Sequence, residues 1–172
     1  LLIGIIIGFI VAFVRCTYDK LSKRNILLRG SNKICNLYLT VTRGTPVLVQ
    51  IMVIYFVIFM PLGFPKFWSA VICFGLNSGA YVAEIFRGGI MAIDHGQFEA
   101  GRSLGFNYFQ TMMYIIIPQV IKAVLPTLCN EFIVLLKETS VAGYVGIMDL
   151  TKAGELIRGR TFSAFMPLIA VA

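Results

Sequence analysis

The chain has 172 residues, of which 58% are hydrophobic and 13% are charged. Soluble globular domains are about half apolar, so this composition excludes an ordinary soluble protein. The apolar residues form long runs and the charges cluster between them, which is typical of a polytopic, all-α membrane protein.

The net charge of +7 is concentrated in one part of the chain. Seven lysines and arginines lie between Arg15 and Arg43, where Asp19 is the only acidic residue. The positive-inside rule predicts such a basic connection on the cytoplasmic side, so we expect no nucleic acid as a partner. A single histidine, His95, and four cysteines without paired spacing argue against a metal site of ordinary ligand composition.

The first and last apolar runs, residues 1–14 and 162–172, are each shorter than the roughly 20 residues that cross a bilayer. We therefore interpret the chain as a fragment whose first and last spans are truncated. The sequence predicts a single transmembrane domain over residues 1–172, with about five transmembrane helices. Gly4 and Gly8 have the small-xxx-small spacing that favours close helix packing, although an unpartnered apolar helix can show the same spacing.

The basic segment ends in an amphipathic pattern, which predicts a helix lying at the membrane surface. The apolar positions of this pattern are Ile34, Leu37, Tyr38 and Val41. Thr45 as N-cap, with Pro46 at the first helical position, then predicts the start of the second span over residues 47–60. Residues 61–65, which contain two prolines and a glycine, predict a tight turn.

The third span is expected over residues 67–85, and it carries a small polar patch in its middle. The patch consists of Asn77, Ser78, Gly79 and Ala80. It could line a transport path or hydrogen-bond a neighbouring helix, and the sequence favours neither. Near the end of this span, Glu84 and Arg87 are three residues apart and can pair on one helix face.

A polar, glycine-punctuated stretch, residues 94–118, separates two long apolar runs and predicts two short helices. Asp94 can cap the first helix near His95, and Asn107 can cap the second. Each cap is followed three residues later by a glutamine, as in a capping box. Gly105 is placed to end the first helix as a left-handed residue. Such a compact helix–Gly–helix element between two spans is suited to be bound by another protein.

The fourth span is expected over residues 115–136, interrupted by Pro118 and Pro126. A polar stripe lies near its end and consists of Asn130, Glu131, Lys137 and Glu138. Ionisable groups at membrane depth normally face a bundle interior, a partner or a water-filled path. Asn130 and Glu131 are therefore candidates for lining a path. Lys137 and Glu138 could instead lie at the far interface, where a charge costs little.

The last predicted elements lie beyond this stripe. Asp149 can cap a short helix over residues 150–158, and the final span is expected to start near Phe162. Counting the crossings places the basic segment and residues 94–118 on the cytoplasmic side. The turn at residues 61–65 and the segment 140–161 are then expected outside.

Residues 99–118 resemble a known family motif. Glu99-Ala100-Gly101, Gly105 and the run that ends at Pro118 resemble the EAA loop of ABC-transporter permease subunits. The third residue is Gly101, where that loop usually has alanine. Further segments extend the resemblance to the polar amino-acid uptake branch of the bacterial permeases, namely residues 43–50, 83–90, 117–119 and 130–140.

The resemblance implies a type I ABC importer permease fold in a multi-pass protein of the bacterial inner membrane. The permease would form the path for a polar or charged amino acid and couple it to ATP hydrolysis. ATP and Mg would be used by a separate ATPase subunit, with no cofactor bound by this chain. The other implied partners are the lipid bilayer, a second permease subunit, identical or different, and an extracytoplasmic amino-acid-binding protein.

Residues 94–118 would form the cytoplasmic coupling loop that docks on the ATPase subunit. Its coupling residues are expected to be Glu99, Ala100, Gly101, Gly105 and Pro118. Polarity at membrane depth gives the candidate substrate-path residues, which are Asn77, Asn130, Glu131, Lys137 and Glu138.

Two other function classes compete with a permease. The sequence has no Gly-Lys-Ser/Thr phosphate loop, so we expect no ATP binding of the P-loop kind and no enzyme. A membrane-embedded enzyme could use Asp94, His95 and Glu99, but neither an orienting partner nor an oxyanion donor is identifiable. A secondary transporter or channel would explain the polar stripe, but it gives no reason for a compact helix–Gly–helix element.

Overall fold

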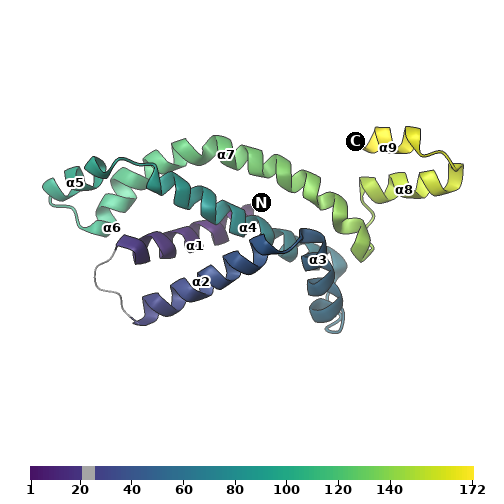
Figure 1. Ribbon diagram of the computed structural model, residues 1–172, viewed down its shortest axis with the longest axis horizontal. Helices are drawn as coiled ribbons and strands as arrows, with labels where there is room; N and C mark the ends of the chain where they lie inside the picture. Colours follow the sequence, from purple (N-terminus) through teal and green to yellow (C-terminus); the bar gives the residue numbers. More distant parts are fainter. Residues whose placement is uncertain (21–25) are drawn as a thin grey trace.

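The structure, a computed structural model, describes residues 1–20 and 26–172. These residues form helices and no strand, which confirms the predicted all-α fold (Figure 1). The elements in chain order are α1 (Leu2–Lys20), α2 (Ile26–Gly44), α3 (Val47–Met52), η1 (Val53–Phe59), α4 (Lys66–Met91), α5 (His95–Ser103), α6 (Tyr108–Thr111), η2 (Met112–Ile116), α7 (Ile117–Glu138), η3 (Thr139–Val145), α8 (Leu150–Thr161) and α9 (Phe165–Val171). The hydrogen bonding is π-helical in η1 and η2 and 3₁₀ in η3.

α1 and α4 pack closely because glycines on α1 let the two backbones approach. A methyl group placed on Gly4 would lie 2.9 Å from the Ser78 Oγ atom. A methyl group placed on Gly8 would lie 2.6 Å from the Val82 Cγ1 atom. Both distances are shorter than a van der Waals contact, so the small-xxx-small spacing does serve close helix packing here.

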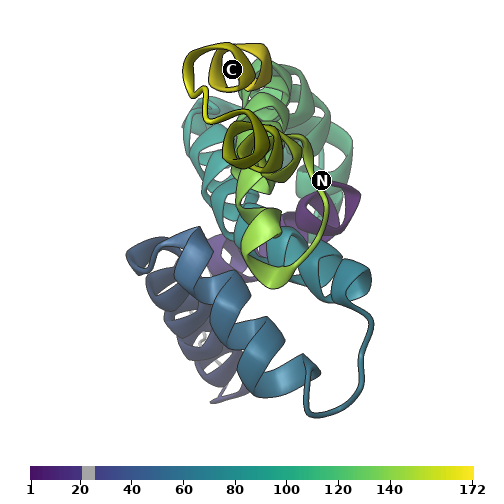
Figure 2. The same ribbon diagram turned by 90° about the vertical axis from the view of Figure 1, so that its right-hand side faces the viewer.

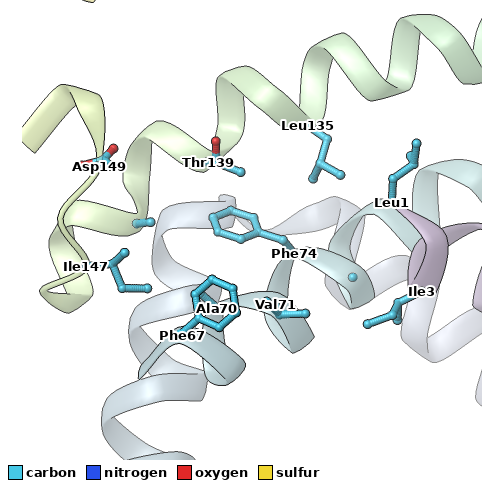
Figure 3. Close-up of a pocket in the computed structure, with 12 residues that line it drawn as sticks. Leu1, Ile3, Phe67, Ala70, Val71, Phe74, Leu135, Thr139, Ile147 and Asp149 are labelled. Atoms are coloured by element: carbon cyan, nitrogen blue, oxygen red, sulfur yellow. The ribbon is translucent and has the colours of Figure 1, made fainter. Parts of the chain in front are cut away.

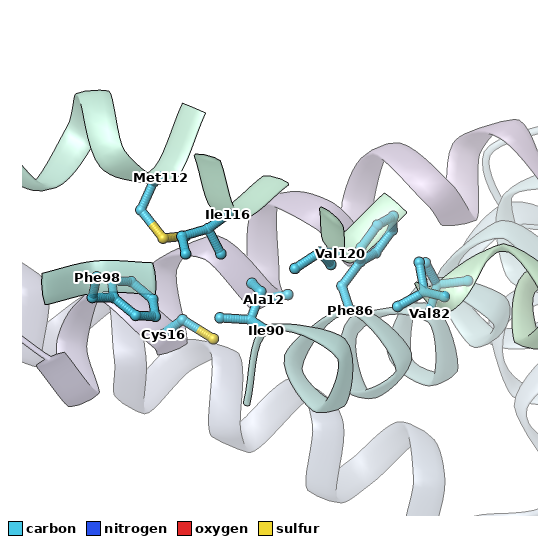
Figure 4. Packing of buried hydrophobic residues seen from close by; sticks show 10 residues of the cluster. Ala12, Cys16, Val82, Phe86, Ile90, Phe98, Met112, Ile116 and Val120 are labelled. Carbon is cyan, nitrogen blue, oxygen red and sulfur yellow. The ribbon is translucent and has the colours of Figure 1, made fainter. Parts of the chain in front are cut away.

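The main buried cluster joins the spans to the helix–Gly–helix element. Figure 4 shows its side chains converging from α1, α4, α5, η2 and α7. Its members are Ala12, Cys16, Val82, Phe86, Ile90, Phe98, Met112, Ile116, Val120 and Val124. Because Phe98 of α5 packs in the same cluster as Ile90 of α4, α5 is fixed to the spans by side-chain packing as well as by its connecting loops.

α2 packs against α1 and α4, and its position at the membrane surface stays a prediction. It runs alongside α1 and α4, where Leu39 is buried in a cluster with Ala80, and the Tyr38 hydroxyl donates to the Leu76 carbonyl. Of the four predicted apolar positions, Ile34, Leu37 and Val41 are exposed and Tyr38 is half-buried. The helix packs through Tyr38 of the predicted apolar face and through Leu39 beside it.

The start of α3 also differs from the prediction. Pro46 is the N-cap, in extended conformation, and its ring offers no capping acceptor. Thr45 lies one residue earlier, and its hydroxyl donates to the Val41 carbonyl of α2 at 2.8 Å. Thr45 therefore caps nothing in α3, because its oxygen is bonded to the preceding helix and to the Gln50 side chain.

Among the described residues, three helical stretches are long and apolar enough to cross a membrane. They are Leu2–Asp19, Lys66–Met91 and Tyr108–Val145. α2 and the α3–η1 helix, bent by 110° at their junction, form a fourth if a broken span is counted. The expected count of about five includes the segment from Phe162, where α9 has seven residues, fewer than a span needs.

Pro118 does not interrupt the fourth span. The helical stretch Tyr108–Val145 has 38 residues and begins well before the predicted start at residue 115. The missing N–H of Pro118 is accommodated by π-helical hydrogen bonding in η2, directly before it. The predicted second short helix, α6, is consequently the first turn of this long helix.

The two ends of the molecule carry the loops that the predicted topology requires. In Figure 1 the C-terminal end of α1 and the N-terminal end of α2 lie at the same end as α5 and α6. The turn after η1 and helix α8 lie at the opposite end, which Figure 2 views directly. Residues 21–25 of the basic segment lie outside the described residues, and which end faces the cytoplasm stays a prediction.

Candidate functional site

α5 is the first half of the helix–Gly–helix element, and it begins at His95 as predicted. The Asp94 carboxylate caps it by accepting from the Gly96 backbone N–H at 2.6 Å. Gln97 does not complete a capping box with Asp94. Its side-chain oxygen instead accepts from the Gln119 amide of α7 at 3.1 Å, which ties α5 to the long helix.

The turn after α5 is a Schellman motif centred on Gly105. Gly105 has a φ of 78°, in the left-handed region that was predicted for it. The Phe106 N–H donates to the Gly101 carbonyl at 3.0 Å, and the Gly105 N–H donates to the Arg102 carbonyl at 2.9 Å. The predicted cap of the next helix is also confirmed, because Asn107 and its partner glutamine form a reciprocal capping box.

The five predicted coupling residues divide by exposure. Glu99, Ala100, Gly105 and Pro118 are exposed, whereas Gly101 is buried. A methyl group on Gly101 would lie 2.6 Å from the Thr111 Cγ2 atom. This contact explains why glycine stands where the EAA loop usually has alanine. α5 packs against Thr111 through Gly101, and Glu99 and Ala100 are exposed on its outer side.

Two exposed apolar side chains beside this surface were not predicted. Leu104 is 70% exposed and Phe109 is 60% exposed, and they flank the Gly105 turn. Next to them, a depression of about 250 Å³ is lined by His95, Phe98, Glu99, Arg102 and Tyr108. The sequence did contain a signal for this surface, because Leu104 and Phe109 are large apolar residues in an otherwise polar stretch. Together these groups form a mixed apolar and charged surface that suits a protein partner.

The enzyme interpretation finds little support at this element. The Asp94 carboxylate is engaged as a helix cap. Residues 101–105 also match the Gly-x-Ser-x-Gly pattern of a nucleophile elbow, but that motif needs a strand-to-helix turn. Ser103 lies instead in the last turn of α5, and its hydroxyl donates to the Glu99 carbonyl at 3.0 Å.

An ion-pair network joins α1, α2 and α4 on the side of Glu84. The Glu84 carboxylate lies 2.6 Å from Arg15, 3.6 Å from Arg43 and 3.9 Å from Arg87. Arg87 also reaches Asp19 at 3.4 Å. The predicted pair of Glu84 with Arg87 is confirmed, but the contact with Arg15, 69 residues away in sequence, is closer.

The candidate substrate-path residues are not gathered in one place. Ser78 of α4 donates to the Glu131 carboxylate of α7 at 3.1 Å, and Glu131 is 8% exposed. Asn77 donates to Gln50 of α3 at 3.0 Å, so both polar groups of the patch bond a neighbouring helix. The other three α7 residues, Asn130, Lys137 and Glu138, do not join them. Asn130 and Lys137 are exposed, and Glu138 is half-buried.

A second cavity, of about 330 Å³, is shown in Figure 3, and it lies at the end of α7 that is far from α5 in Figure 1. It is lined by the beginnings of α1 and α4, the end of α7, η3 and the residues that follow η3. Its walls are apolar apart from Thr139 and Asp149, and the Asp149 carboxylate already accepts from the Lys152 N–H. This cavity therefore offers few contacts to a polar amino acid.

Comparisons with known proteins agree with this architecture. Residues 4–172 match the family model described as binding-protein-dependent transport system inner membrane component. The glutamine transport system permease protein GlnP of Escherichia coli (strain K12) is 36% identical, over 98% of this chain and 74% of that protein. The arginine transport system permease protein ArtQ of Bacillus subtilis (strain 168) is 36% identical, over 98% of this chain and 74% of that protein. The crystal structure of an amino acid ABC transporter with histidines has a TM-score of 0.84 at 41% identity, covering 98% of this chain and 75% of that chain.

Proposed function

From its membership of the family of binding-protein-dependent transport system inner membrane components, we propose how this chain works. It is a permease of an amino-acid ABC importer. Its fold is that of a type I importer permease. We propose that it forms the path for a polar or charged amino acid, such as glutamine or arginine. We also propose that it couples this path to ATP hydrolysis in a separate ATPase subunit.

The observation that carries the coupling proposal is the way α5 is fixed to the spans. Phe98 packs in the main buried cluster, Gly101 lies against Thr111, and Gln97 accepts from Gln119. A force applied to the outer surface of α5 is therefore passed to the 38-residue helix Tyr108–Val145. That helix can be moved only by a partner whose contact with α5 differs between two states of the partner. An ATPase subunit that changes shape when it binds and hydrolyses ATP would make such a contact.

Side chains at membrane depth on α7 support a path between subunits. Glu131 is buried against Ser78, but Asn130 and Lys137 on the same helix are exposed. Polar groups at this depth need a partner or a water-filled path. A second permease subunit, identical or different, facing this side of α7 would enclose them. The substrate would then pass between the two permease subunits.

The remaining partners follow from the same proposal. The ATPase subunit would use ATP and Mg on the cytoplasmic side, since this sequence contains no Gly-Lys-Ser/Thr phosphate loop. An extracytoplasmic amino-acid-binding protein would dock at the end that carries α8. The chain would be a multi-pass protein of the bacterial inner membrane, and its basic segment between Arg15 and Arg43 would lie on the cytoplasmic side.

Co-purification from membranes tests the coupling proposal. The tagged chain should retain an ATPase subunit, and Glu99→Arg should lose it, because Glu99 is exposed on the outer side of α5. Glu155→Arg is the matched control, because Glu155 lies on α8 at the opposite end. Loss of the ATPase subunit in both variants, or in neither, would contradict the assignment of α5 as the coupling helix.

A further inference from the structure

The junction of α2 and α3 is a sharp bend at which one side chain bonds two backbone carbonyls. The two helices meet at 110°. The Gln50 amide nitrogen donates to the Thr42 carbonyl at 2.7 Å, the Thr45 carbonyl at 2.9 Å and the Thr45 hydroxyl at 2.8 Å. Gln50 thus supplies, from within α3, a donor for the Thr42 carbonyl at the end of α2 and for the Thr45 carbonyl in the connection between the helices.

Such a bend in a membrane protein needs these bonds. Backbone polar groups cannot turn to water inside a bilayer, and broken helices occur there only where their free groups are satisfied by the protein or a cavity. An amide has two N–H donors, and Gln50 divides them among three acceptors in Thr42 and Thr45. Removing this side chain would leave the two carbonyls without the donors that now serve them.

Gln50 also attaches the bend to α4 through its carbonyl oxygen. The Asn77 side-chain N–H donates to this oxygen at 3.0 Å, and Asn77 is 2% exposed. The Asn77 carbonyl oxygen is buried and has no hydrogen-bond partner among the described residues. A buried acceptor without a donor is unfavourable. The Asn77 side chain would therefore lose little by moving to a position in which its oxygen also gains a donor.

A second contact attaches the other arm of the bend to α4. Arg43, in the last turn of α2, lies 3.6 Å from the Glu84 carboxylate. Its guanidinium also sits over the Tyr81 ring, 5.8 Å from the ring centre. α2 and α3 are therefore each fastened to α4 by a polar side chain, one on either side of the bend.

The surroundings leave room for the bend to move. A methyl group placed on Gly44 would meet no described atom within 4 Å. A cavity of about 330 Å³ lies against the bend, and its lining includes Tyr38, Thr42, Thr45 and Gln50. The bend is held by specific polar contacts and not by tight packing on all sides.

We propose that Gln50 is a positioning residue that latches the α2–α3 bend onto Asn77, and that the bend acts as a hinge during transport. Asn77 is followed on α4 by Ser78, which donates to Glu131 of α7. The bend and the long helix that carries the coupling element therefore contact adjacent residues of α4. A shift of α7 against α4 changes the position in which Gln50 is held. The hinge role rests on the proposed function, whereas the latch itself does not.

Hydrogen exchange of the purified, membrane-reconstituted protein tests the latch without any transport activity. Asn77→Leu removes only the attachment to α4, and Gln50→Met removes that attachment and the caps on the bend. Both should speed amide exchange in peptides covering residues 42–52 by at least about tenfold. The matched control is Asn36→Leu, since Asn36 is exposed on α2, and it should leave exchange there unchanged. Unchanged exchange in Asn77→Leu would overturn the latch.

The ratio of amino acid accumulated to ATP hydrolysed tests the hinge in vesicles that contain the assembled transporter. Asn77→Leu should lower this ratio at least about threefold, whereas Asn36→Leu should leave it unchanged, because Asn36 is exposed on α2. An unaltered ratio in Asn77→Leu, with faster exchange, would overturn the hinge and leave the latch. If the unmodified transporter shows no ATP-driven uptake, the proposed function fails while the exchange result still decides the latch.

Discussion

The left-handed turn at Gly105 provides a graded test of the coupling element. Gly105 has a φ of 78°, and a methyl group placed there would meet no described atom within 4 Å. Within this chain, substitutions at this position therefore act through backbone strain. The two Schellman hydrogen bonds, at 2.9 and 3.0 Å, hold the backbone in this conformation and prevent it from relaxing without loss of the turn.

The cost should follow how well each residue tolerates a positive φ. We expect about 0.5 kcal/mol for Gly105→Asn, about 1 kcal/mol for Gly105→Ala and about 2 kcal/mol for Gly105→Val, whose β-branched side chain resists this region most. These costs would raise the fraction of molecules with an opened turn by about 2-fold, 5-fold and 30-fold. Substrate-stimulated ATP hydrolysis should fall in the same order.

Peptide-resolved hydrogen exchange over residues 95–107 measures the opening of the turn, and ATP hydrolysis with and without amino acid measures coupling. Gly159→Val is the control, because Gly159 lies within α8 with ordinary helical backbone and has no described atom within 4 Å of a placed methyl group. Equal effects of Gly105→Asn and Gly105→Val would refute backbone strain as the cause. A large effect of Gly159→Val would point to a general loss of folding.

Three further predictions concern packing and the path. Gly101→Ala should destabilise the protein by about 1–3 kcal/mol through overpacking, and adding Thr111→Ala should recover most of this in thermal unfolding; a double variant no better than the single one would disprove the contact. Gly8→Ala should lower the unfolding temperature, whereas Gly30→Ala, with no described atom near a placed methyl group, should be neutral or stabilise by up to about 1 kcal/mol; equal shifts would contradict the close α1–α4 contact. Glu131→Gln should still assemble with the ATPase subunit but import more slowly, and unchanged uptake kinetics would remove Glu131 from the path.

The features that the sequence predicted correctly are governed by short-range chemistry. Gly105 and Asn107 lie within three residues of the groups they bond, so turn and cap preferences were sufficient to place them. Asp149 is similar, and it caps α8 by accepting from the N–H three residues later. The first, third and fourth expected spans coincide with helices that are long and apolar enough to cross a membrane, because long apolar runs mark such helices.

The misplaced features depend on contacts between distant parts of the chain. Periodicity gave α2 an apolar face that includes Tyr38, but it could not show that Tyr38 alone of these residues would contact α4, where the Leu76 carbonyl accepts from it across 38 residues. Thr45 fits an N-cap by type, yet the bend brings its hydroxyl to Val41 and to Gln50. Neither outcome could be inferred without knowing how the helices are arranged.

The candidate path shows the same limit at the level of single residues. Asn130 and Glu131 are neighbours in sequence, and both are polar at membrane depth. Glu131 turns towards Ser78, 53 residues away, whereas Asn130 points away from the rest of the chain. Helical spacing separates their directions by about 100° but does not say which direction meets α4.

Uptake into sealed vesicles is the most direct test of ATP coupling. Vesicles would contain this chain with its co-purified partners, oriented with the ATPase subunit inside, and would be loaded with ATP and Mg or given an imposed ion gradient instead. Radiolabelled amino acid and its binding protein would be added from outside. We predict accumulation with ATP and Mg, none with the gradient alone, and loss of ATP-driven uptake in Gly105→Val. Accumulation driven by the gradient in vesicles that hold this chain alone would contradict coupling through α5.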